Sequence, residues 1–103
     1  MSTEVSNNTA LERFEIYVDG AIVGYAEYQD TASERAFVHT EINPQYQGQG
    51  YGALLVETAL NSTRDDKLGA LPMCPMVNHF IETRPEYLSM VPHWARDRLH
   101  LPQ

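Results

Sequence analysis

Three glycines stand at alternate positions in the segment Gln47-Gly-Gln-Gly-Tyr-Gly-Ala53, where a predicted strand ending at Ile42 gives way to a predicted helix beginning near Gly50. Glycines let the backbone approach an anion closely and turn its N–H groups toward it. The N-terminus of a helix adds free N–H groups and the positive end of the helix dipole. The segment therefore predicts a phosphate or pyrophosphate site, and a flexible glycine turn is the alternative.

Two familiar nucleotide-binding motifs do not fit this segment. A P-loop requires Lys followed by Ser or Thr after its last glycine, but here Ala53 follows Gly52. A Rossmann fingerprint follows the first strand of its fold, whereas this turn follows the third predicted strand. The expected phosphate group therefore belongs to a different class of ligand.

Cys74 is the single cysteine of the chain and cannot form an internal disulfide. It comes directly before Pro75, where a short helix is predicted to begin, and the positive end of that helix favours a thiolate. An accessible, reactive nucleophile is one interpretation. A buried, inert core thiol is the other.

His39 and Glu41 lie two residues apart on one predicted strand, so their side chains project from the same face. Either could accept a proton from an amine, and a structural role on a half-exposed strand is the alternative for each. The remaining histidines have no spacing typical of metal ligands, so no metal site is expected. They are His79, His93 and His100.

The elements that must position these residues follow from the hydrophobic periodicity and the turn signals. Strands are predicted over residues 14–18, 21–28, 36–42 and 68–73, and helices over residues 50–60 and 75–83. Asp19-Gly20 fits a tight hairpin. With Val18 paired to Ala21, the expected core face carries Phe14, Ile16, Val18, Ala21, Val23 and Tyr25.

This order of elements predicts an α/β (strictly α+β) fold: a mixed, mainly antiparallel sheet of four or five strands with helices on its faces. Residues 1–12 are polar and aperiodic and are expected to form a flexible N-terminal tail. A single domain is expected over residues 13–91. Residues 92–103 are expected to form an extended C-terminal tail.

Composition narrows the classes of partner. The 103 residues carry a formal net charge of -7, which disfavours nucleic acid. The N-terminus resembles no targeting segment and no apolar run is long enough to span a bilayer, so the expectation is a cytoplasmic protein with no membrane partner. The oligomeric state is not fixed by the sequence.

The pattern Gln47-x-x-Gly50-x-Gly52 after a strand resembles the acetyl-CoA motif of the GNAT N-acetyltransferase superfamily. More narrowly, several motifs resemble those of a group of very small, truncated GNAT-like proteins, over about residues 14–88. These motifs are Tyr17-Val-Asp-Gly, Gly24-Tyr-Ala-Glu-Tyr, His39-Thr-Glu-Ile, Tyr46-Gln-Gly-Gln-Gly, Cys74-Pro and Pro85-Glu-Tyr87. The resemblance implies a minimal GNAT-like fold and acetyl-CoA, or coenzyme A, as the acyl donor.

The resemblance also implies the residues of the site. The implied cofactor-binding residues are Ile42, Gln47, Gly48, Gln49, Gly50, Tyr51, Gly52, Ala53 and Cys74. In such proteins the strand before the motif splays from the next strand to admit pantetheine. Small truncated GNAT-like proteins also carry a cysteine at the position of Cys74, which the resemblance places near the thioester. The candidate catalytic residues are Cys74 and, from their place on the strand just ahead of the turn, His39 or Glu41 as the base that accepts the amine proton.

Two features depart from the superfamily pattern. Gln47, Gln49 and Tyr51 stand where arginines are common, so the backbone alone supplies the positive field. The usual tyrosine acid has no clear counterpart, because Phe80 occupies its helix and Tyr87 lies beyond it.

The predicted function is transfer of an acetyl or short acyl group from coenzyme A to an amine acceptor, which the sequence does not identify. A backbone N–H near residues 40–42 would polarise the thioester, and Cys74 could take the acyl group first. The alternatives are a non-catalytic acyl-CoA binding or sensing module and a small interaction protein without a cofactor.

Overall fold

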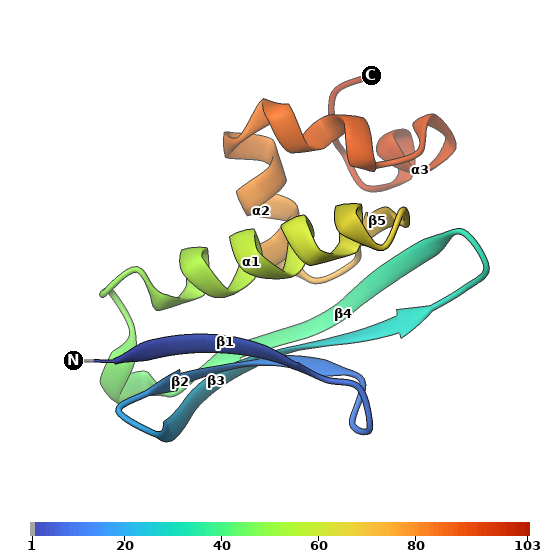
Figure 1. Cartoon of the computed structure of the whole chain (residues 1–103). Coiled ribbons are helices and arrows are strands. Elements are labelled where there is room, and N and C mark those ends of the chain that lie inside the picture. Colours follow the sequence, from blue (N-terminus) through green and yellow to red (C-terminus); the bar gives the residue numbers. More distant parts are fainter. Residues whose placement is uncertain (1) are drawn as a thin grey trace.

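The computed structural model describes residues 2–103, and its five strands form one sheet in the order β1-β2-β3-β4-β5 (Figure 1). The first four strands pair antiparallel, and β5 pairs parallel to β4. The predicted mixed, mainly antiparallel sheet is thus confirmed. The strands are β1 (Thr3–Asn8), β2 (Arg13–Val18), β3 (Ala21–Asp30), β4 (Glu34–Ile42) and β5 (Gly69–Pro72).

The helices lie on one side of the sheet, where α1 runs across it in Figure 1. Between them and the sheet lies the core, which includes the fully buried Phe14, Phe37 and Leu55. Over the described residues, no helix is long and apolar enough to cross a bilayer. The helical elements are η1 (Pro44–Tyr46), α1 (Tyr51–Asp65), α2 (Pro75–Thr83), η2 (Pro85–Met90) and α3 (His93–Arg98).

The β2–β3 hairpin forms as predicted at its turn, with Val18 paired to Ala21. Further along, Ile16 lies opposite Gly24 and Tyr17 opposite Ile22, so the pairing contains a β-bulge. A bulge adds one residue to one strand and reverses the faces of the residues beyond it. The expected core face is therefore wrong for Tyr25, which lies on the other face of the sheet with Glu41 as its partner on β4. It is also wrong for Ala21, which is exposed beside the turn although it pairs with the buried Val18.

Both expected tails contain regular structure. Residues 3–8 form β1, which pairs with β2 along its whole length, although only Val5 packs against the core. Backbone hydrogen bonds to β2 hold this edge strand. Because such bonds do not depend on the side chains, the sequence of β1 shows no hydrophobic alternation from which the strand could be predicted. At the other end α3 forms, Leu101 is buried, and Arg96 donates to the carbonyls of Val91 and Leu88. The flexible N-terminal tail and extended C-terminal tail are thus corrected for these segments.

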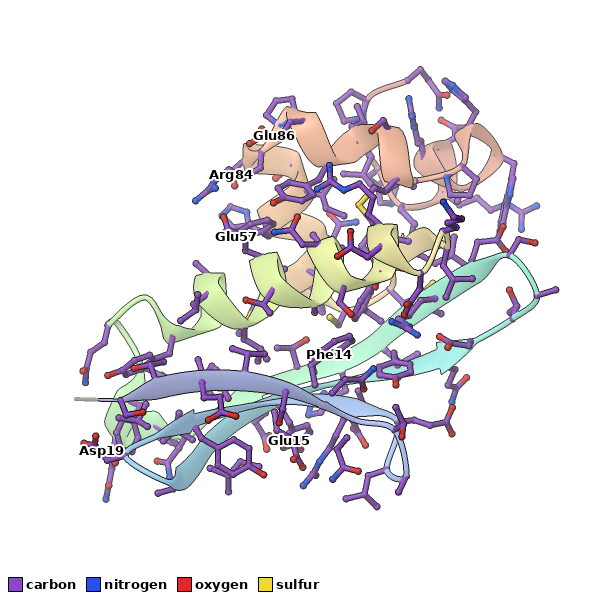
Figure 2. All side chains as sticks on the ribbon, viewed as in Figure 1. Phe14, Glu15, Asp19, Glu57, Arg84 and Glu86 are labelled. Atoms are coloured by element: carbon purple, nitrogen blue, oxygen red, sulfur yellow. The ribbon has the colours of Figure 1, made fainter. Side chains whose placement is uncertain are left out.

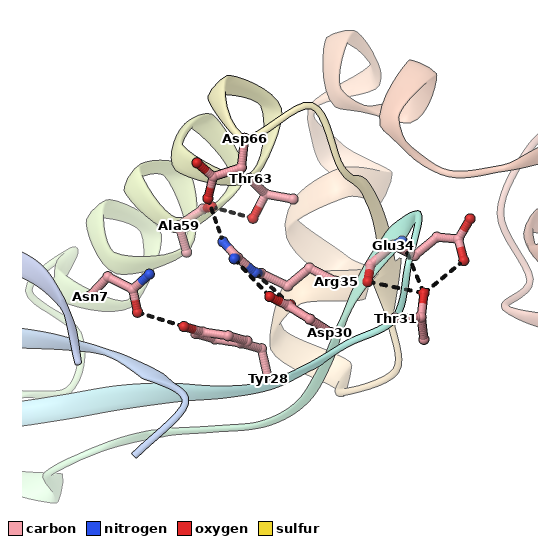
Figure 3. Close-up of polar contacts among 9 residues, drawn as sticks. All are labelled: Asn7, Tyr28, Asp30, Thr31, Glu34, Arg35, Ala59, Thr63 and Asp66. Carbon is pink, nitrogen blue, oxygen red and sulfur yellow. Dashed lines mark hydrogen bonds and ion pairs between the residues drawn. The ribbon is translucent and has the colours of Figure 1, made fainter. Parts of the chain in front are cut away.

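A buried arginine ties the β3–β4 turn to the C-terminal end of α1 (Figure 3). The Arg35 guanidinium donates to both carboxylate oxygens of Asp30, at 2.8 and 3.0 Å, and lies 3.4 Å from Asp66 at the end of α1. It also stacks 4.3 Å from the centre of the Tyr28 ring. These contacts set the position of α1 over the sheet, and with it the glycine turn at the other end of the helix.

Candidate functional site

The two parallel strands β4 and β5 separate halfway along β4. Their pairing ends at Phe37 and Pro72, and Pro72 has no N–H with which to continue the ladder. The Cys74 N–H donates to the Phe37 carbonyl at 2.9 Å, and α2 then begins at Pro75. Beyond Phe37, β4 continues to Ile42 without β5 beside it, which leaves a fork between residues 38–42 and the start of α2.

The backbone of β4 turns polar groups toward this fork. Asn43 N–H donates to the Val23 carbonyl and therefore faces β3. Since alternate residues of an antiparallel strand face opposite neighbours, Ile42 and Thr40 face away from β3. The Ile42 carbonyl agrees with this direction, because it accepts a hydrogen bond from the Gln47 side chain at 3.3 Å.

The glycine turn follows β4 and leads into α1. Gly48 and Gly50 have positive φ angles of 79° and 85°, and Gly50 is the N-cap residue of α1. No side chain among residues 2–103 caps this helix, and its first turn carries no acidic residue. The first N–H groups of α1 are thus available to a ligand, at the end of the helix that favours an anion.

A hollow of about 150 Å³ lies inside this turn. Six of the nine residues expected to bind the cofactor line it: Ile42, Gln47, Gly48, Gly50, Tyr51 and Gly52. Ala53 lines an adjoining hollow between α1 and α2. Gln49 is exposed and donates to the Gln45 carbonyl, and Cys74 lines neither hollow.

The first turns of α1 and α2 lie next to each other at this point. A Cβ atom added to Gly52 would meet Met76 Sδ at 3.2 Å and Ile42 Cγ1 at 3.7 Å. The absence of a side chain at Gly52 therefore brings α2 close to α1. Met76 lines both hollows and forms the boundary between them.

Cys74 is the N-cap residue of α2 and so lies directly before this helix, where the sequence placed it. Its side chain is only 3% exposed and belongs to the hydrophobic core. Its sulfur lies 3.2 Å from the hydroxyl of Thr40, on the helix-covered side of β4. The expectation of an accessible thiol is therefore wrong, and the burial agrees with the alternative of a core thiol.

His39 and Glu41 project from the opposite face of β4, which no helix within residues 2–103 covers (Figure 1). His39 Nε2 lies 3.6 Å from Glu41 Oε1, and both side chains are more than half exposed. The Tyr25 hydroxyl donates to Glu41 Oε2 at 3.1 Å. This hydrogen bond, followed by partial burial, raises the pKa of Tyr25, so its hydroxyl stays a donor. The structure thus brings His39 and Glu41 together and places Cys74 on the other side of the strand.

A polar network on this open face was not expected from the sequence. Figure 2 shows Glu15 on the side of the sheet away from the helices. Its carboxylate accepts hydrogen bonds from Arg13 at 2.7 Å, Tyr17 at 2.8 Å and Asn8 at 3.2 Å. Burial alone would raise the pKa of Glu15, but the three donors outweigh it and lower that pKa. Alternating polar residues at 13, 15 and 17 were the available signal.

Metal ligands do not gather in the part of the chain that the structure describes: no three side chains of His, Cys, Asp or Glu are placed to hold an ion. The chemistry that the site offers is therefore that of an anion cradle, a strand edge with free backbone groups, and two exposed proton acceptors.

Comparison with protein families gives a match over most of the chain. The family model described as GCN5-related N-acetyl-transferase matches residues 13–90, from the first residue of β2 to the last of η2. The match includes the glycine turn, the fork and both helices beside them. A comparison with curated proteins finds no match.

Proposed function

We propose that this chain, which belongs to the GCN5-related N-acetyltransferase family, transfers an acetyl group from acetyl-CoA to an amine. The observation that carries the proposal is the uncapped N-terminus of α1, which follows two glycines of positive φ at the end of the strand that borders the fork. The helix N-terminus suits a pyrophosphate and the fork suits a thioester, and acetyl-CoA, which carries both groups, needs the two features side by side.

The pyrophosphate would bind to the N–H groups of the glycine turn and of the first turn of α1, residues 48–53. Gln47, Gln49 and Tyr51 carry no charge, so the backbone dipoles supply the attraction. From there the pantetheine arm would follow the free edge of β4 toward the fork. In this arrangement the Gln47 side chain would act indirectly, through the hydrogen bond that it donates to the Ile42 carbonyl at the end of β4.

The reaction would take place where the edge of β4 faces the fork. The amine nitrogen attacks the thioester carbonyl carbon, the C–S bond breaks, and the sulfur leaves with the electron pair. A backbone N–H near Thr40 or Ile42 would stabilise the oxyanion that forms on the carbonyl oxygen. Holding the two reactants in this geometry supplies the remaining part of the rate enhancement.

The proton of the amine would pass to His39 or Glu41. Both are exposed on the open face of the sheet, within 3.6 Å of each other. The acceptor would therefore approach from the face without helices and reach the thioester past the edge of β4. Transfer would be direct, because Cys74 is buried and its sulfur already contacts Thr40. Cys74 would then be part of the wall behind the thioester.

Calorimetric titration with acetyl-CoA tests the cofactor, and a panel of amines assayed by release of free CoA thiol tests transfer. We expect binding, slower transfer in His39→Ala or Glu41→Gln, and unchanged CoA affinity in both variants. Absence of binding at millimolar acetyl-CoA would refute the proposal.

Binding without transfer to any amine would instead favour the second candidate, an acyl-CoA binding or sensing module. The observation that favours this candidate is the burial of Cys74, because a buried thiol is not available to the site as a nucleophile.

A further inference from the structure

A second hollow, of about 350 Å³, lies in the groove between α1 and α2. It shares Gly50, Gly52 and Met76 with the hollow inside the glycine turn, so the two adjoin each other at the N-terminus of α1. Ala53, Val56 and Phe80 form an apolar wall in its middle. The groove therefore extends the anion cradle along the outside of α1.

Arg84 stands at the far end of this groove. It is the C-cap residue of α2 and the only Lys or Arg, among the described residues, that lines either hollow. Its guanidinium lies 4.9 Å from the centre of the Phe80 ring and 3.4 Å from Glu57 Oε2 on α1. Figure 2 shows the Arg84 and Glu57 labels close together on the same side of the molecule.

The position along α1 sets how far this cation lies from the cradle. Glu57 is six residues beyond Tyr51, the first residue of α1. At about 1.5 Å per residue, Glu57 lies roughly 9 Å along the helix axis from its N-terminus. An anion bound at the helix N-terminus and a second anion at Arg84 would thus be separated by less than two helical turns.

Coenzyme A carries two such anions: the pyrophosphate and a phosphate on the 3′ position of the adenosine ribose. We propose that Arg84 binds this 3′-phosphate and that the nucleoside lies against the apolar wall of the groove. The assignment rests on the proposed function. It makes Arg84 a specificity-determining residue that distinguishes coenzyme A from its dephosphorylated form.

The ion pair with Glu57 does not prevent this role. The Arg84 and Glu57 side chains are 45% and 42% exposed, and a pair so exposed to water is weak. A phosphate offers Arg84 a bidentate partner with more negative charge. Glu57, however, keeps a negative charge close to the bound phosphate, so its removal strengthens binding.

Calorimetric titration with CoA and with dephospho-CoA, which lacks the 3′-phosphate, tests the assignment. We expect the wild type to bind CoA about fivefold more tightly, the size typical of one exposed charge pair. Arg84→Gln reduces CoA affinity to the dephospho-CoA level and leaves dephospho-CoA affinity unchanged. Glu57→Gln increases CoA affinity a few-fold. Glu86→Gln removes the same charge next to the helix end without touching Arg84, and is the matched control that changes little.

Equal affinity of the wild type for the two ligands overturns the assignment while leaving the proposed function in place. So does an equal loss for both ligands in Arg84→Gln, or an equal gain in Glu57→Gln and Glu86→Gln. Should Arg84→Gln fail to fold, the comparison of the two ligands on the wild type and on Glu57→Gln still decides. Failure of the wild type to bind either ligand overturns the proposed function and this assignment with it.

Discussion

Gly20 and Gly50 offer a matched pair of substitutions that separates backbone strain from ligand contact. Both have φ of 85°, and no described atom lies within 4 Å of a Cβ added to either. Gly20 is in the β2–β3 turn, whereas Gly50 occupies the N-cap position of α1, inside the proposed cradle, and provides no side-chain cap. Replacing either by alanine therefore adds the same left-handed strain and no steric clash.

The magnitude follows from the backbone alone. A left-handed residue with a Cβ costs about 1–2 kcal/mol. In a domain of this size each kcal/mol lowers the melting temperature by about 4–8 °C. We therefore expect Gly20→Ala and Gly50→Ala to melt about 4–16 °C below the wild type and close to each other.

Ligand contact separates the two variants. A Cβ at residue 50 projects into open space beside the free N–H groups of α1, where the pyrophosphate is proposed to bind. Thermal melting with and without millimolar CoA should show a ligand-dependent rise for the wild type and Gly20→Ala, and none for Gly50→Ala. An equal rise in both variants would refute the cradle. Wild-type melting temperatures in both would refute the left-handed turns themselves.

Further predictions concern packing, acid stability and the thiol. Gly24→Ala should lower the free energy of unfolding by about 1–3 kcal/mol, because its Cβ would lie 2.5 Å from Ile42 Cδ1 and 2.7 Å from the Glu41 carbonyl oxygen; unchanged urea unfolding would contradict the close β3–β4 contact. Glu15→Gln should be less stable than the wild type above the ordinary carboxyl pKa of 4.5. Because the folded-state pKa of Glu15 is lowered, this advantage of the wild type should disappear as the pH falls through that lower value; a difference that persists in acid would rule out the carboxylate as its source. Cys74 should react with a thiol reagent much more slowly in the native protein than in urea, since it is 3% exposed; rapid native labelling would show that the core opens there.

Local periodicity was sufficient for the elements that hold the core. The alternation over residues 14–18 and the Asp19-Gly20 turn predicted the β2–β3 hairpin, and the change to helical spacing at Gly50 predicted α1. In each case the signal lies within a few residues of the feature, so the sequence alone contains it.

The features that the sequence did not predict depend on partners far along the chain. Strand β1 is polar and is held by backbone pairing with β2. The bulge that moves Tyr25 off the core face depends on the register between two strands. No single-strand pattern specifies either of them.

The site likewise contains features that the local sequence predicts and features that depend on residues far along the chain. The glycine turn was predictable because its residues are consecutive. The burial of Cys74 depends on Thr40 and on the packing of α2, which no local pattern gives. Arg84 joins the groove only because α2 packs against α1, and more than thirty positions separate it from the glycines.

The neighbouring first turns of α1 and α2 have a consequence for the kinetics of ligand association. Each helix N-terminus carries roughly half a positive charge, so the two together make a small positive region on a protein whose net charge is -7. A strongly anionic ligand such as CoA would thus be repelled at a distance and attracted on contact. Salt screens interactions beyond about 8 Å at physiological ionic strength and affects buried contacts less. The association rate constant should therefore increase with salt while the dissociation rate constant changes little, the reverse of the usual behaviour for an anion and its binding protein.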